Sequence, residues 1–165
     1  MNAGVVDSAG MQTRAAFRST GAEGQPGLEP NRRIAWAVMS VGALTGLVMG
    51  LWSFDGPVPV PGWLGEYGST ARRLVRLGHI ACFGIGILNL LLVAEAEKKP
   101  SMTPGLRWAS RCMNLGNIGL PLGLFAAAVV SPLKYAMAVP ATAVTVALLL
   151  VAWDTFRADT EGGGR

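Results

Sequence analysis

The feature that most constrains this 165-residue chain is a set of four long apolar stretches between residues 34 and 153. They cover residues 34–52, 74–94, 108–130 and 135–153. Each approaches or exceeds the roughly 20 residues that a helix needs to cross about 30 Å of hydrocarbon. In a bilayer only a helix or a closed barrel satisfies its own backbone polar groups, and runs such as 88–94 lack the alternation of barrel strands. The sequence therefore predicts an all-α, polytopic integral membrane protein, a bundle of four transmembrane helices.

The composition agrees with a membrane protein. Hydrophobic residues make up 51% of the chain and charged residues only 15%, against about 25% charged residues in an average soluble domain. The net charge of +4 is divided among tails and loops instead of being gathered in one basic stripe, so we expect no nucleic-acid partner. The partner that the composition predicts is the lipid bilayer.

The two ends of the chain differ from the apolar middle. Residues 1–33 mix Gly, Ser, Ala and Pro with scattered charges and contain no apolar run that resembles a signal peptide. Such a segment buries too little apolar surface to offset the entropy lost on ordering. We therefore predict a disordered tail over 1–33, a transmembrane domain over 34–153, and a second disordered tail over 154–165.

The distribution of basic residues predicts the orientation in the membrane. With four spans, both termini and the loop after residue 94 lie on one side, and that side carries ten basic residues: Arg14, Arg18, Arg32, Arg33, Lys98, Lys99, Arg107, Arg111, Arg157 and Arg165. The other side carries four: Arg72, Arg73, Arg76 and Lys134. Because cytoplasmic loops are enriched in Lys and Arg, we predict a multi-pass protein of the plasma (inner) membrane with both termini in the cytoplasm.

Small residues recur at intervals of about four in the first three spans. These ridges consist of Gly42, Gly46 and Gly50 in the first span, Gly78, Cys82 and Gly86 in the second, and Cys112, Gly116, Gly119 and Gly123 in the third. Small residues at this spacing allow two helix backbones to approach closely. The pattern predicts a tightly packed bundle, although one ridge could equally serve a homodimer.

Three asparagines lie inside the predicted spans. Asn89 in the second span and Asn114 in the third lie at one depth in the cytoplasmic half. We predict a hydrogen bond between their amides across the two helices, of the kind worth about 0.6–2 kcal/mol in membranes. Asn117 lies nearer the middle and has no obvious partner in the sequence.

The outer half of the second span carries the strongest concentration of polar groups. Arg72 and His79 lie within about 20° of each other around the helix, and Arg76 lies about 60° from His79. Such groups are costly in lipid, so we predict one protein-facing cluster beneath the proline-rich loop at 53–69. Met49 of the first span and Met137 of the fourth lie at depths where they can meet His79.

His79 admits several roles. It can be a structural histidine that bonds a backbone carbonyl or Thr142. It can be an axial ligand of haem b, with Met137 or Met49 as the second ligand and Arg72 and Arg76 paired with the propionates. It can also belong to a pocket for a quinone or a lipid headgroup, or bind copper with methionines. Because the chain has one histidine, bis-histidine haem ligation within a monomer is excluded.

Three functions remain open at this stage. The absence of hydrolase, metalloprotease, nucleotide-loop and dinucleotide motifs argues against an independent enzyme. The first expectation is an accessory or structural subunit of a larger membrane assembly, or a homo-oligomer. The alternative is a redox subunit associated with haem b or quinone and centred on His79. The third is a small transporter or channel, which needs a polar pathway.

Overall fold

The computed structural model of the chain describes residues 27–53 and 56–162, so the predicted disorder of residues 1–26 lies outside the described residues. The long helices are α2 (Glu29–Gly50), α3 (Thr70–Glu97), α4 (Pro104–Val129) and α5 (Ala138–Gly162), with short 3-10 helices η1 (Gly62–Leu64) and η2 (Ser131–Met137). Among these described residues, four helices are long and apolar enough to cross a membrane. The predicted fold, an all-α bundle of four transmembrane helices, is confirmed.

Local capping signals explain where these helices begin. The Ser69 hydroxyl accepts a hydrogen bond from the Arg72 backbone N–H at 3.2 Å, and Thr103 accepts one from Leu106 at 3.1 Å. Both side chains satisfy N–H groups that have no partner within the helix. Pro30 and Pro104 lie in the first turns of α2 and α4, where a missing N–H costs nothing.

The helices extend beyond the predicted apolar spans. The helix of the first span begins at Glu29, five residues before the predicted start at residue 34, so residues 29–33 belong to α2 and not to a disordered tail. At the other end α5 continues to Gly162, so residues 154–162 are helical. Hydropathy underestimates these helices because their end turns carry polar residues, although residues such as Asn31 and Asp154 find partners within the bundle.

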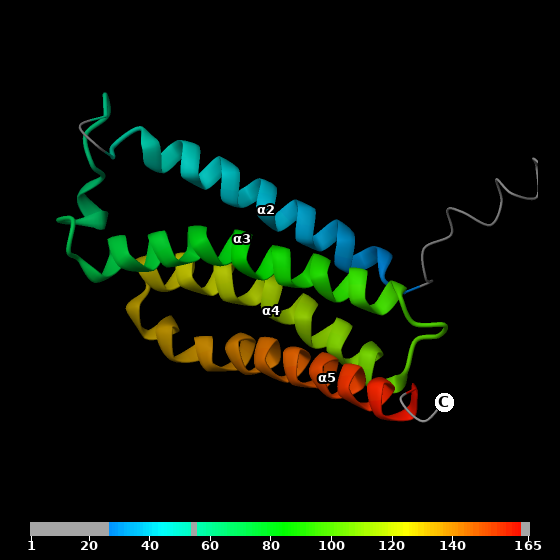
Figure 1. Cartoon of the computed structure of the whole chain (residues 1–165). Helices are drawn as coiled ribbons and strands as arrows, with labels where there is room; N and C mark the ends of the chain where they lie inside the picture. Colours follow the sequence, from blue (N-terminus) through cyan, green and yellow to red (C-terminus); the bar gives the residue numbers. More distant parts are fainter. Residues whose placement is uncertain (1–26, 54–55, 163–165) are drawn as a thin grey trace, which may run out of the picture.

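Consecutive helices pack side by side, and α4 is the central helix because it contacts α2, α3 and α5 (Figure 1). We call the end of the bundle that carries the start of α2 and the end of α5 the tail end, and the end that carries η1 and η2 the loop end. Figure 1 shows α2 close to α3 at the tail end and diverging from it toward the loop end. An ion pair of 2.7 Å between Arg32 of α2 and Glu97 of α3 joins these helices at the tail end.

The buried hydrophobic core is concentrated in the tail half of the bundle. Leu28, directly before α2, is 2% exposed and packs in this core. The other buried members come from α3, α4 and α5: Ile85, Leu92, Val93, Ala96, Leu106, Ala109, Met113 and Ala147. The helix interfaces are therefore tightest where α2 begins.

Glycines allow the closest approach between α2 and α3. A Cβ placed on Gly42 would lie 2.7 Å from Cβ of Cys82, and one on Gly46 would lie 2.6 Å from Cε1 of His79. On the α3 side, a Cβ on Gly86 would lie 2.6 Å from Cγ of Met39. Gly50, the last glycine of the predicted ridge in α2, has nothing within 4 Å. The close contact thus ends before the loop end of α2.

Other glycines of the α3 and α4 ridges pack against α4, α5 and η2. A Cβ on Gly78 would lie 2.9 Å from the Phe125 ring of α4. Gly119 lies against Pro140 of α5. Gly123 lies against Met137 of η2, which leaves no room for a Cβ.

We predict that Gly42→Ala destabilises the bundle by about 1–3 kcal/mol, the usual cost of overpacking. Cβ of Cys82 is fixed to the α3 backbone, so the two helices must separate to accommodate the methyl group. The matched control is Gly84→Ala, because Gly84 has nothing within 4 Å and alanine is favoured over glycine in a helix by up to about 1 kcal/mol. The free energy of unfolding of each variant is measured in detergent micelles. Equal destabilisation by the two substitutions would contradict the proposed close contact.

Candidate functional site

A cluster of four polar side chains lies between α2, α3 and α4 in the tail half. The Asn31 amide nitrogen donates to Oδ1 of Asn89 at 2.7 Å and to the Ser110 carbonyl at 3.2 Å. Its amide oxygen accepts from the Ser110 hydroxyl at 2.6 Å and from the Asn114 amide at 3.1 Å. Asn31 is thus bonded at every polar atom of its side chain. We refer to Asn31, Asn89, Ser110 and Asn114 as the amide cluster.

The amide cluster also joins α3 directly to α4. The bond predicted between Asn89 and Asn114 is present, with the Asn89 amide nitrogen 3.1 Å from Oδ1 of Asn114. Asn31 and Asn89 are fully buried, and Ser110 is 6% exposed. Because hydrocarbon offers these groups no other partner, separating the helices would leave several buried amide groups unpaired. The cluster therefore holds three helices in one register.

Asn117 differs from the amide cluster although it lies on the same helix. It is fully buried, and both its amide nitrogen and its amide oxygen lack a hydrogen-bond partner among the described residues. An unpaired buried polar group costs about 1–3 kcal/mol. The sequence pattern, which offered Asn117 no partner, agrees with this placement.

The imidazole of His79 faces α2. Its Nδ1 lies 3.0 Å from the Gly42 carbonyl oxygen and 3.4 Å from the Thr45 hydroxyl. Since a carbonyl oxygen only accepts hydrogen bonds, Nδ1 is the donor in this contact. Phe83 packs edge-on at 5.3 Å between ring centroids. The structural role outlined for His79 fits this geometry, with Thr45 in place of Thr142.

Arg72 and Arg76 turn toward the loop instead of His79. Both guanidinium groups lie over the ring of Tyr67, at 5.3 Å and 4.3 Å from its centroid. Arg76 also donates to the Tyr67 carbonyl oxygen at 3.1 Å. No carboxylate among the described residues forms an ion pair with either arginine. The structure therefore separates the three residues expected in one cluster into a histidine that contacts α2 and two arginines that contact Tyr67.

The two methionines proposed as partners of His79 lie in different places. The Met137 side chain fills the space over Gly123 of α4. Met49 lines an apolar groove near the loop end. The described residues contain no group of three or more His, Cys, Asp or Glu side chains placed to hold a metal ion.

That groove, the loop-end groove, has a volume of about 390 Å³ and opens between the diverging half of α2 and the neighbouring helices. One wall is α2 from Val41 to Met49 with Trp52 just beyond the helix, and the other includes Val75 of α3 and Phe125 of α4. Trp63 of η1 lies at its mouth. Its lining is almost entirely apolar, so the groove suits an apolar ligand.

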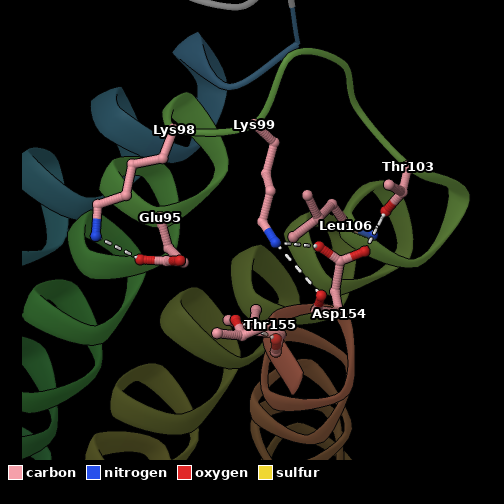
Figure 2. A network of polar contacts seen from close by, with 8 residues as sticks. Glu95, Lys98, Lys99, Thr103, Leu106, Asp154 and Thr155 are labelled. Atoms are coloured by element: carbon pink, nitrogen blue, oxygen red, sulfur yellow. Dashed lines mark hydrogen bonds and ion pairs between the residues drawn. The ribbon is translucent and has the colours of Figure 1, made fainter. Parts of the chain in front are cut away.

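A second polar network connects the loop between α3 and α4 to α5 at the tail end (Figure 2). The Lys99 ammonium lies 3.3 Å from a carboxylate oxygen of Asp154, whose other oxygen accepts from the Thr103 hydroxyl at 2.9 Å. Both ionised side chains are 17% exposed. Thr103 caps α4 and binds Asp154 at the same time, so this network fastens the start of α4 to α5. By contrast, the neighbouring pair of Lys98 with Glu95 joins residues of one exposed turn.

Sequence reasoning missed two important participants in these sites. Asn31 fell within the predicted tail, and Asp154 fell just after the last predicted span. The signal for Asn31 was present, because Pro30 is typical of a helix start and positions 31, 35 and 42 fall on one helical face. Nothing comparable in the sequence indicates that Tyr67 meets the two arginines.

Comparison with known proteins finds no match: no family model, curated protein or solved structure resembles this chain significantly.

We predict opposite effects for two substitutions of buried asparagine. Asn31→Ala should lower the free energy of unfolding by about 1–3 kcal/mol, because it leaves the partners in the amide cluster unpaired. Asn117→Leu should raise it by about 1 kcal/mol, because it removes an amide that has no partner among the described residues. Ser40→Ala is the control, since Ser40 is exposed and its hydroxyl bonds the Trp36 carbonyl of its own helix. Unfolding in mixed detergent micelles measures all three; a destabilised Asn117→Leu variant would show that Asn117 has a partner in the membrane.

Proposed function

We propose that this chain is an accessory or structural subunit of a larger membrane assembly, and that it is not an enzyme in its own right. The proposal is carried by the hydrogen bonds that the polar side chains within the spans form. Within the spans, Asn31, Asn89, Ser110, Asn114 and His79 all bond groups on other helices. Side chains committed to helix association in this way serve architecture more directly than acid–base chemistry.

The uneven burial of the helices supports a partner on α2. The other helices bury 11% of the most apolar window of α2, compared with 39% for α3. The face of α2 opposite the loop-end groove is exposed and includes Trp36, Ala43 and Leu47. We propose that a helix of another subunit packs on this face, where a small residue such as Ala43 permits close approach.

The proposal includes a location and an orientation. The excess of basic residues at the tail end favours a cytoplasmic tail end in the plasma (inner) membrane. Trp36, Trp108 and Trp153 lie toward that end and are exposed, as expected for side chains at a membrane–water interface.

We predict that a tagged chain, solubilised from its native membrane in mild detergent, migrates as a complex larger than the 17.2 kDa chain. The complex should dissociate in Ala43→Leu, because the larger side chain occupies the proposed contact face. Ala141→Leu, at an exposed position of α5, is the matched control and should leave the complex intact. Native gel electrophoresis followed by identification of the bands measures both variants.

A monomer at every detergent concentration, with no partner retained after crosslinking in intact membranes, would contradict this function. Loss of the complex in both variants would instead place the contact away from this face of α2. Circular dichroism of each purified variant establishes that the helices are intact.

A second candidate, a haem b or quinone redox subunit, is favoured by one detail of His79. With Nδ1 bonded to the Gly42 carbonyl, the lone pair of Nε2 is directed away from that bond, the arrangement commonly found in a metal-binding histidine. A haem would need Met49 as its second ligand, since Met137 packs on Gly123. A Soret band in the purified protein that disappears in His79→Ala would favour this candidate over the first.

A further inference from the structure

The loop-end groove has the length of one membrane leaflet. Its α2 wall extends from Val41 to Met49, a rise of about 12 Å at 1.5 Å per residue, and Trp52 directly beyond the helix continues the wall. Half of a hydrocarbon core about 30 Å thick is about 15 Å. Trp52 and Trp63 lie at the mouth, and tryptophan prefers the membrane–water interface. The groove therefore extends from the interface to about the middle of the bilayer, which is the depth of one acyl chain.

The volume of the groove suits a small apolar occupant. It is about 390 Å³, within the range of pockets that hold one small-molecule ligand. The only hydroxyl side chain in its lining, Thr45, donates to the Gly42 carbonyl at 2.8 Å. An occupant within the groove thus needs little or no polar character.

The end of the bundle beside this apolar groove has the opposite character, because it is positively charged. Arg72 lies one turn closer to the loop end than Val75, which lines the groove, and about 60° around α3. Arg76 lies beside it through their shared contact with Tyr67. At the loop end the described residues carry four basic side chains, Arg72, Arg73, Arg76 and Lys134, against one acidic side chain, Glu66. The positive end of the α3 dipole adds to this potential.

We propose that the loop-end groove binds one acyl chain of an anionic phospholipid, whose phosphate pairs with Arg72 and Arg76. Guanidinium groups bind phosphate oxygens with two parallel hydrogen bonds, and both arginines have no carboxylate partner among the described residues. The bound lipid fills the space left by the divergence of α2. This inference concerns a different face of α2 from the proposed subunit contact and does not depend on it.

The experiment uses the full chain in nanodiscs that contain equal amounts of phosphatidylglycerol and phosphatidylcholine. After release into mild detergent, native mass spectrometry counts and identifies the lipid retained per chain. We expect one phospholipid per chain. Phosphatidylglycerol should be preferred about tenfold, because the two arginines bind a headgroup with net negative charge more strongly than a neutral one.

Two matched pairs of variants separate the acyl chain from the headgroup. Val48→Trp fills the groove and should abolish retention, whereas Val139→Trp, at an exposed position of α5, should retain the lipid. Arg72→Gln combined with Arg76→Gln should keep one lipid per chain but lose the preference for phosphatidylglycerol. Arg73→Gln removes an exposed neighbouring charge about 100° around α3 from Arg72 and should behave as the original chain.

Several results would overturn the proposal. They are a folded chain that retains no lipid, equal retention of the two phospholipids, and unchanged retention in a folded Val48→Trp variant. A quinone, or a second copy of the chain that is displaced by Val48→Trp, would identify a different occupant. If Val48→Trp does not fold, the arginine variants test the proposal instead. These variants should fold, because the arginine side chains lie at the interface and outside the helix contacts.

Discussion

The bonds between Asn31 and the asparagines and serine of α3 and α4 determine how α2 joins this bundle. In water, separated amides would find new partners at once, so such bonds would contribute little. In hydrocarbon no replacement exists, and the cost of parting the helices includes every amide left unpaired. The fully buried Asn31 satisfies all its side-chain polar atoms from two other helices. One residue in the first turn of α2 thereby fixes the depth, rotation and neighbours of the whole helix.

The remaining features of α2 follow from that attachment. Beside the amide cluster, Leu28 enters the core and Arg32 pairs with Glu97, so the tail end is held by apolar, polar and ionic contacts together. Gly42 and Gly46 then keep α2 close to α3 as far as His79. Beyond Gly46 no interaction of this kind continues, and α2 diverges (Figure 1). The loop-end groove is the consequence, because the half of α2 that leans away leaves space between itself and the neighbouring helices.

Hydropathy was sufficient to predict the fold class, since four apolar runs of span length leave few alternatives in a bilayer. The bond between Asn89 and Asn114 was also predictable, because antiparallel neighbouring spans of known length fix which residues share a depth. The rest of the amide cluster was not found in this way. Asn31 lies among charged residues that resemble a tail, and only the start signal of Pro30 indicates a helix there.

The site around His79 shows a different limit of sequence reasoning. Helical periodicity grouped His79 with Arg72 and Arg76, and it could indicate which face of α3 they share. It could not indicate that long arginine side chains turn toward the interface and stack on Tyr67, a residue of an irregular loop. Side-chain length and loop conformation decide that contact, and neither is encoded in periodicity. The divergence of α2, and hence the groove, likewise depends on a balance between contacts at its two ends.

The central claim is that the amide cluster anchors α2 at the tail end and leaves its other half free to diverge. Distances between spin labels test it most directly, in a chain with both cysteines replaced by alanine. One label pair replaces Trp36 and Trp108 in the tail half, and the other replaces Leu47 and Leu122 in the loop half. The account predicts a narrow distance distribution for the tail pair, a broader one for the loop pair, and broadening of the tail pair in Asn31→Ala. A tail pair that is as broad as the loop pair, or unaffected by Asn31→Ala, would contradict it.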